Sequence, residues 1–152
     1  MIALFAGSFD PFTIGHRSIV ERGLALFDKI VIAVGHNEHK RGDWSEEQRI
    51  EAISALYSGN PNVEVTGYKG LTVDFAKKIG AKVLLRGVRG VADFEYERNL
   101  ADTNRMIGDI ETVLLISEPE FSFISASMVR ELLHNGHDVT KYIAGDFPLP
   151  NH

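Results

Sequence analysis

The chain has 152 residues, of which 44% are hydrophobic and 24% charged, with no cysteine and a formal net charge of −5. Its length fits a single domain over residues 1–152. The lack of cysteine excludes disulfides, thiolate metal ligands and a cysteine nucleophile. The acidic balance argues against a nucleic-acid partner. We also expect no membrane partner and a cytoplasmic location, because the sequence shows neither a secretory leader nor an apolar run of about 18 residues.

Short apolar runs alternate with segments of helical periodicity. In chain order, the patterns predict a strand at Ile2–Ala6, a helix at Gly15–Phe27, a strand at Ile30–Val34, a helix from a Ser45 cap to about Leu56, a strand at Val63–Thr66, a helix at Val73–Ile79, a strand at Lys82–Leu85, a helix at Ala92–Met106, a strand at Thr112–Ile116 and a helix at Ser127–Leu133. Ser45 and Gln48 have the spacing of a capping box. Gly80 is placed to end a helix in the left-handed conformation.

This alternation predicts an α/β fold, a single Rossmann-like domain with a five-stranded parallel sheet flanked by helices. Parallel sheets of this kind bind ligands beyond the carboxyl ends of their strands. The segments that follow the strands should therefore carry the chemistry, and they are Gly7–His16, Gly35–Arg41, Arg86–Arg89 and Glu118–Ser127.

The first strand–helix connection has the features of a phosphate site. Gly7 and Gly15 permit close approach of a ligand to the backbone, and Ser8 and His16 can donate hydrogen bonds. A helix N-terminus also attracts anions. An ordinary strand–helix turn would show the same residue types, so this connection alone does not decide between the two. The chain contains neither a Walker A motif nor a dinucleotide-binding glycine pattern.

Basic residues follow the second and fourth predicted strands. Lys40 could neutralise a phosphate as a point charge, and Arg86 and Arg89 could bind phosphate in bidentate fashion. The spacing of His36 and His39 would allow a metal site, but a polar surface loop is the preferred interpretation, and no metal site is predicted.

Each of the later basic and polar segments has a structural alternative. Arg86 and Arg89 could instead pair with acidic residues of the next helix, Asp93, Glu95 or Glu97. The serines that precede the last helix could be simple N-caps. Their other role would be to aim a second helix N-terminus at phosphates.

Taken together, these segments resemble phosphopantetheine adenylyltransferases of the nucleotidyltransferase superfamily. The matching pieces are Gly-Ser-Phe-Asp-Pro at residues 7–11, Thr-Ile-Gly-His at 13–16, the loop of Lys40, Arg-Gly-Val-Arg-Gly-Val-Ala-Asp-Phe-Glu-Tyr-Glu at 86–97, Asn104-Arg105 and Phe-Ser-Phe-Ile-Ser-Ala-Ser at 121–127. The first motif is shared by the superfamily, whereas the run at 86–97 is more specific. The resemblance implies adenylyl transfer from ATP to 4'-phosphopantetheine, giving dephospho-coenzyme A and pyrophosphate.

The resemblance also implies roles for individual residues. His16, Lys40 and Arg89 would be catalytic. Residues implied to bind ATP are Ser8, Phe9, His16, Gly87, Val88, Arg89, Glu97, Phe121, Ser122, Phe123, Ile124, Ser125, Ala126 and Ser127. Those implied to bind phosphopantetheine are Ser8, Lys40, Thr72 and Arg86. Ser8 stands where the family usually has threonine, and Thr72 stands at a position often occupied by methionine or leucine.

The resemblance further implies Mg²⁺ bound with ATP, feedback inhibition by coenzyme A and a homohexamer. Two other functions remain open at this point. One is a sister nucleotidyltransferase that acts on nicotinate mononucleotide or glycerol phosphate, which should lack the run at 86–97. The other is a nucleotide-binding module without catalysis, against which His16, Lys40 and Arg89 argue.

Overall fold

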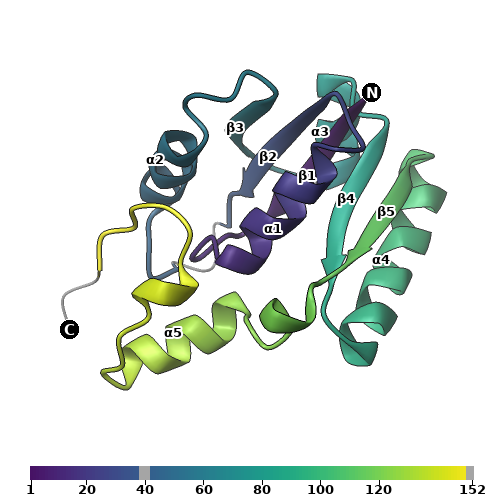
Figure 1. Ribbon diagram of the computed structural model, residues 1–152. Coiled ribbons are helices and arrows are strands. Elements are labelled where there is room, and N and C mark those ends of the chain that lie inside the picture. The colour runs from purple at the N-terminus through teal and green to yellow at the C-terminus, as the bar shows by residue number, and fades with distance from the viewer. Residues whose placement is uncertain (38–41, 150–152) are drawn as a thin grey trace.

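In the computed structural model, which describes residues 1–37 and 42–149, five parallel strands form one sheet in the order β3-β2-β1-β4-β5 (Figure 1). The strands are β1 (Ile2–Gly7), β2 (Lys29–Gly35), β3 (Val63–Tyr68), β4 (Val83–Val88) and β5 (Glu111–Ile116). The helices are α1 (Ile14–Gly23), α2 (Glu46–Leu56), α3 (Thr72–Ile79), α4 (Val91–Gly108) and α5 (Ala126–His134), with short 3₁₀ turns at Pro119–Phe121 and Thr140–Tyr142. The predicted α/β class and five-stranded parallel sheet are confirmed.

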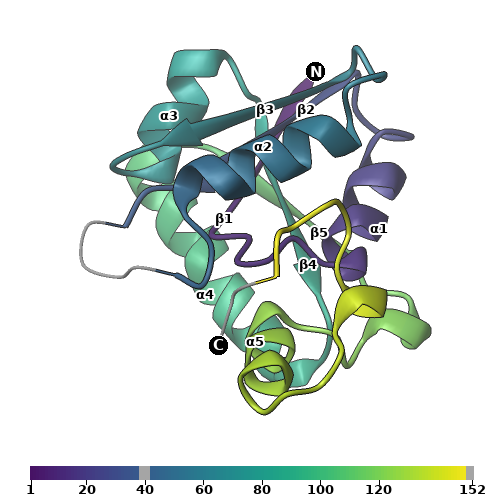
Figure 2. The ribbon, with the colours of Figure 1, turned by 90° about the vertical axis from the view of Figure 1, so that its left-hand side faces the viewer.

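Helices cover both faces of the sheet (Figure 2). On one face, Phe5, Ile32 and Leu85 pack with residues of α1, α2 and α5. On the other, Leu4 and Leu84 pack with α3. Burial on both faces explains why the central strands are continuous apolar runs rather than alternating patterns.

Short sequence motifs determine where α2 begins and where α3 ends. The Ser45 hydroxyl accepts from the backbone N–H of Gln48, whose side chain accepts from the Ser45 N–H, so the predicted capping box at the start of α2 is confirmed. Gly80 ends α3 with φ of 75°, the left-handed conformation that glycine adopts without strain.

The helix predicted at Gly15–Phe27 is shorter, since α1 ends at Gly23. Gly23 lets α1 lie close to the sheet, because a Cβ atom there would fall 2.8 Å from Leu85 Cδ2. The chain then turns to enter β2, and Phe27 reaches the core from that turn. Apolar spacing alone did not distinguish the helix from the turn.

The strand predicted at Lys82–Leu85 starts at Val83 and runs to Val88. Arg86, Gly87 and Val88, which were predicted to follow the fourth strand, therefore lie in β4, where they pair with residues 114–116 of β5. Pairing with β5 outweighs the weak strand preference of glycine. The absent Cβ of Gly87 leaves room for Ile19 of α1, whose Cγ1 would lie 3.0 Å from it. The other predicted bounds agree with the structure to within two residues.

The C-terminal segment returns across the first loop, the connection between β1 and α1 (Figure 1). Ile143 forms a β-bridge with Thr13, and the Ala144 N–H donates to the Phe12 carbonyl at 3.0 Å. The Trp44 indole N–H donates to the Pro148 carbonyl, and its ring meets that of Phe147 edge-on at 5.5 Å. This segment thus braces the first loop from outside. No helix in the described part of the chain is both long and apolar enough to span a membrane.

We expect Phe147→Ala to lower the free energy of unfolding by about 3 kcal/mol, because it removes a buried ring and leaves a cavity under the brace. Phe123→Ala is the matched control, since that ring is 59% exposed and its loss should cost less than about 1 kcal/mol. Urea denaturation measures both. Equal losses in the two variants would contradict a structural role for the brace.

Candidate active site

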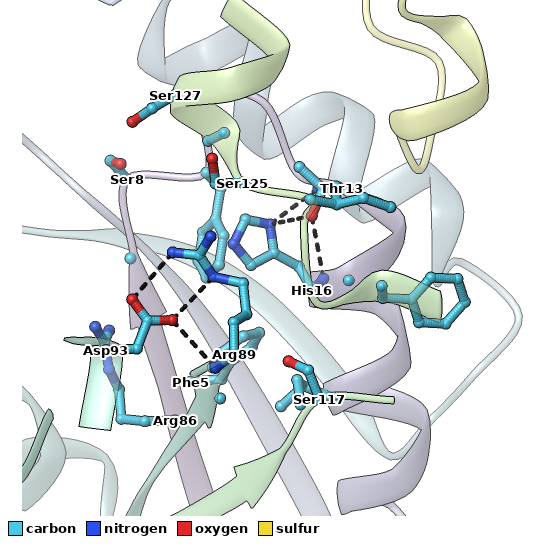
Figure 3. A pocket seen from close by; sticks show the side chains of 18 of the residues that line it. Phe5, Ser8, Thr13, His16, Arg86, Arg89, Asp93, Ser117, Ser125 and Ser127 are labelled. Carbon is cyan, nitrogen blue, oxygen red and sulfur yellow. Dashed lines mark hydrogen bonds and ion pairs between the residues drawn. The ribbon is translucent and has the colours of Figure 1, made fainter. Parts of the chain in front are cut away.

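The carboxyl ends of β1 and β4 open into a cleft of about 330 Å³ (Figure 3). Its walls come from the first loop, the N-terminal turns of α1 and α5, and the start of α4. Among the side chains that bring polar or charged groups to it are Ser8, His16, Arg89 and Arg130. This is the sheet edge at which the sequence predicted ligand binding.

Aromatic rings fix the position of the His16 side chain. Phe12 stacks on the imidazole with ring centres 5.4 Å apart, and Phe9 and Phe5 meet it edge-on at 5.1 and 6.1 Å. Phe9 has φ of 48°, in the left-handed region that a side chain of this size rarely adopts. Its ring is 3% exposed, so burial holds this conformation in place.

Thr13 determines which nitrogen of His16 carries the proton. The Thr13 backbone N–H donates to His16 Nδ1 at 2.9 Å, and the Thr13 hydroxyl accepts from the His16 backbone N–H at 3.2 Å. The pair forms a capping box with histidine in the place usually taken by glutamate or glutamine. Because Nδ1 accepts, the proton of the neutral ring resides on Nε2, which is then a hydrogen-bond donor.

His16 is neutral at physiological pH. Burial lowers its pKa to about 3, and the positive charges of Arg86 and Arg89 act in the same direction. The site therefore offers a neutral N–H donor here, with the positive charge supplied by the arginines.

Both arginines of β4 and the turn after it pair with carboxylates of α4. Arg86 donates to both oxygens of Glu97 at 2.7 and 2.8 Å and to the Ala6 carbonyl at 2.7 Å. Although burial opposes its charge, Glu97 outweighs that effect and raises the pKa of Arg86. Arg89 pairs with Asp93 at 3.0 Å. The pairing of these arginines with acidic residues of the next helix, which the sequence allowed as an alternative, is therefore present. Both arginines also line the cleft.

A second pocket, of about 500 Å³, adjoins the first. The two share Ala6, Gly7, Ser8, Arg86 and Tyr96 in their linings. At its far wall the Tyr68 and Thr72 hydroxyls lie 2.9 Å apart, beside Leu100 and the buried Asn104. Two pockets that meet at Ser8 and Arg86 can hold two ligands end to end.

Most residues predicted to bind ligands line one of these pockets. The cleft contains Ser8, Phe9, His16, Gly87, Arg89, Glu97, Phe121, Ile124, Ser125, Ala126 and Ser127. The second pocket contains Ser8, Thr72 and Arg86. Lys40 lies outside the described residues, as does His39.

Three predicted ATP-binding residues are not brought to the cleft. Val88 is 7% exposed within β4, where alternation along the strand directs it away from the side that Gly87 lines. Ser122 donates to the Pro119 carbonyl, and the Phe123 ring packs against Tyr142. A fourth predicted residue, Glu97, does line the cleft, but its carboxylate already accepts from Arg86.

Several pocket residues were missed from the sequence. Arg130 lines the cleft and donates to the Asp10 carbonyl at 2.7 Å. Its position three residues after Ser127, on the same helix face, was an available signal. In the second pocket, Tyr68, Leu100 and Asn104 were not predicted to bind a ligand, although Asn104 belongs to the Asn104-Arg105 piece of the resemblance.

No group of three or more potential metal ligands occurs among residues 1–37 and 42–149. His36 Nδ1 instead donates to the Glu46 carboxylate at 2.7 Å, which links the end of β2 to the first turn of α2. In the described region this imidazole therefore serves a structural pair.

The comparisons with known proteins agree with this geometry. Residues 4–132 match the cytidylyltransferase-like family model. A putative nicotinate-nucleotide adenylyltransferase of Vibrio parahaemolyticus superposes with a TM-score of 0.68 at 18% identity, over 94% of this chain and 86% of its own. The nicotinic acid mononucleotide adenylyltransferase of Plasmodium falciparum gives 0.66 at 14% identity, over 93% and 89% of the two chains. Fold and family match together define a nucleotidyltransferase.

More similar relatives narrow the class. The phosphopantetheine adenylyltransferase of Porphyromonas gingivalis is 53% identical over 97% of both chains. That of Leuconostoc citreum is 48% identical over 90% of this chain and 87% of its own. The chain belongs to the phosphopantetheine adenylyltransferase family and is a nucleotidyltransferase enzyme.

The lowered pKa of His16 predicts how stability changes with pH. Between pH 6.5 and about 3 the unfolded chain binds a proton that the folded protein excludes, so stability falls as the pH falls through this window. Between pH 8 and pH 5, protonation of this residue in the unfolded chain should lower the free energy of unfolding by up to about 2 kcal/mol.

His16→Gln should abolish that contribution, because the amide does not titrate. His137→Gln, at an exposed position, is the control and should retain the wild-type pH dependence. Urea unfolding of the three proteins at pH 8 and pH 5 measures the difference. If the free energy of unfolding of His16→Gln fell between pH 8 and pH 5 by as much as that of the wild type, His16 would not be held neutral.

Proposed function

We propose that this enzyme transfers the adenylyl group of ATP to 4'-phosphopantetheine, giving dephospho-coenzyme A and pyrophosphate, as a step of coenzyme A biosynthesis. The observation that carries the proposal is the junction of two pockets at Ser8 and Arg86. ATP would occupy the cleft and phosphopantetheine the second pocket, so that their phosphates meet. The names of relatives about half identical to this chain support the same acceptor.

The proposed reaction needs little acid–base catalysis. The attacking phosphate oxygen of phosphopantetheine is already ionised, and it forms a bond to the α-phosphorus of ATP as the bond to pyrophosphate breaks. Neither a general base nor a covalent enzyme intermediate is required. The enzyme must align two polyanions and stabilise the charge that develops.

The site residues suit that task. His16 would donate from Nε2 to a phosphate oxygen, and Arg89 would supply positive charge, as would Lys40, for which the proposal rests on the sequence. The Ser8 hydroxyl stands where both substrates would meet. The N-terminal turn of α5 lines the cleft through Ala126 and Ser127, and its free N–H groups suit phosphate binding.

We propose that Mg²⁺ enters with ATP. The described residues offer no dedicated cluster of metal ligands, which fits an ion held mainly by substrate phosphates. When bound, the ion neutralises charge on the phosphate oxygens. Within this chain, Arg86 and Arg89 supply further positive charge at the same edge of the sheet.

The second pocket fits an acceptor with amide groups along an apolar arm. Leu4, Leu84 and Leu100 provide apolar contacts, and Asn104 brings a side-chain amide to the lining. This amide can both donate and accept hydrogen bonds, so an amide of the ligand would pair with it. Phosphopantetheine has such amides, whereas a mononucleotide acceptor has an aromatic base.

Three further expectations belong to this proposal. Coenzyme A carries the same pantetheine arm and would inhibit by competing for the site. A homohexamer is supported by exposed apolar side chains on α4 and β5, among them Val91, Met106 and Ile116, each at least 75% exposed. A cytoplasmic location follows from the substrates. Competition kinetics and light scattering test the first two.

We expect pyrophosphate release when the wild-type enzyme, Mg²⁺ and ATP are supplied with phosphopantetheine, and none with nicotinate mononucleotide or glycerol phosphate. His16→Ala should lower kcat about a hundredfold or more with a smaller change in the KM for ATP, because it removes one transition-state donor. The exposed His137→Ala should behave as wild type. Binding of ATP without turnover of any acceptor would instead support a nucleotide-binding module.

We expect Asn104→Leu to raise the KM for phosphopantetheine about tenfold while the KM for ATP stays within about twofold, because the substrate amide loses its partner. Asn99→Leu, at an exposed position on α4, is the matched control and should change neither constant. Steady-state kinetics with each substrate varied measures both. A rise in the KM for ATP alone would contradict the assignment of the two pockets.

A further inference from the structure

Arg49 of α2 is a buried arginine that lines neither pocket. It is 8% exposed, Nη1 donates to the Ser8 carbonyl, and Nε donates to the Ser45 carbonyl at 3.3 Å. Within residues 1–37 and 42–149, no carboxylate lies within ion-pair distance of its guanidinium. The side chain therefore donates its hydrogen bonds to backbone carbonyls.

Packing alone does not account for an arginine at this place. A buried charge with only carbonyl partners is more costly than an apolar side chain of similar volume. Ala52 and Ile53, on the same helix, are apolar and join the core. What distinguishes Arg49 from a leucine or methionine is its bond to Ser8.

That bond sets the orientation of the peptide between Ser8 and Phe9. This peptide is trans, so its carbonyl and its N–H point in opposite directions. With the Ser8 carbonyl held toward α2, the Phe9 N–H is turned away from α2. This N–H has no acceptor within the described residues, and both Ser8 and Phe9 line the cleft.

The conformation needs such a restraint. Phe9 is in the left-handed region with φ of 48°, which costs about 1 kcal/mol or more for a residue other than glycine. A change in the orientation of this peptide would relieve the strain. It would also move the Ser8 hydroxyl and the Phe9 N–H.

A second contact holds the same two segments from the other direction. The buried carboxylate of Asp10 accepts from the backbone N–H groups of Asp43 and Trp44, each at 3.0 Å. A side chain of the first loop thus binds the backbone before α2, while a side chain of α2 binds the backbone of the first loop. This reciprocal arrangement keeps Arg49 within reach of Ser8.

We propose that Arg49 is a positioning residue, which holds the Ser8–Phe9 peptide so that the Ser8 hydroxyl and the Phe9 N–H meet the phosphates of ATP. It acts through Ser8 and does not touch the substrate. The identity of the ligand rests on the proposed function.

The test compares Arg49→Met, which keeps a similar volume without the donors, with Arg49→Lys, which keeps the positive charge and replaces the guanidinium by a single ammonium group. Arg22→Met is the matched control, because Arg22 is half-buried in α1 and lines neither pocket. Calorimetry with a non-hydrolysable ATP analogue gives the affinity, and steady-state kinetics gives kcat and both KM values. Thermal unfolding confirms that each variant is folded.

We expect Arg49→Met to weaken binding of the ATP analogue about tenfold and to lower kcat, with a smaller change in the KM for phosphopantetheine, because Ser8 lines both pockets but Phe9 lines the cleft alone. Arg49→Lys should recover part of the loss, and Arg22→Met should change neither. Wild-type affinity in folded Arg49→Met, or an equal loss in Arg22→Met, would overturn the proposal.

If Arg49→Met does not fold, the proposal is tested with Arg49→Lys alone. Analogue binding that is weakened more than the KM for phosphopantetheine is raised supports the proposal, and equal changes in both or in neither overturn it. Wild-type binding of the analogue without turnover of phosphopantetheine would contradict the proposed function and leave the comparison of Arg49 variants intact.

Discussion

The pairing of β1 with β4 at the centre of the sheet is the constraint on which the site depends. β1 also pairs with β2, and the chain reaches β4 only after β3 at the far edge. The connections that leave β1 and β4 therefore run to opposite faces, and the cleft opens between them. His16, Arg86 and Arg89 come from segments far apart in the sequence, and this one pairing gathers them at a common edge.

Charge at this edge is distributed in an unusual way for a protein that is acidic overall. His16 contributes a neutral donor whose tautomer is set by the backbone of Thr13. The formal positive charge belongs to arginines that already have carboxylate partners on α4. Those carboxylates hold the guanidinium groups in place before any phosphate arrives, so less order has to be created when a substrate binds.

The sequence was sufficient for features that depend on local pattern. The capping box at Ser45, the stop at Gly80 and the apolar run of β2 were predicted because each is decided by a few neighbouring residues. Arg86 to Val88 were predicted to follow the strand rather than belong to it, because the residues of β5 that pair with them are distant in sequence. Arg49 was missed for the same reason, since the Ser8 carbonyl comes within its reach only when α2 packs on the sheet. The residues themselves carried the resemblance to a family, while the pairing of each arginine with its carboxylate required the structure.

The brace that the C-terminal segment forms on the first loop joins the two ends of the chain. Phe12 and Thr13 are synthesised well before Ile143, Ala144 and Phe147, because they lie far upstream of them in the sequence. On the ribosome, the sheet could assemble before the loop that holds His16 receives its outer support. The outer support of the first loop is thereby tied to synthesis of this later segment, and a chain released before it would lack that support.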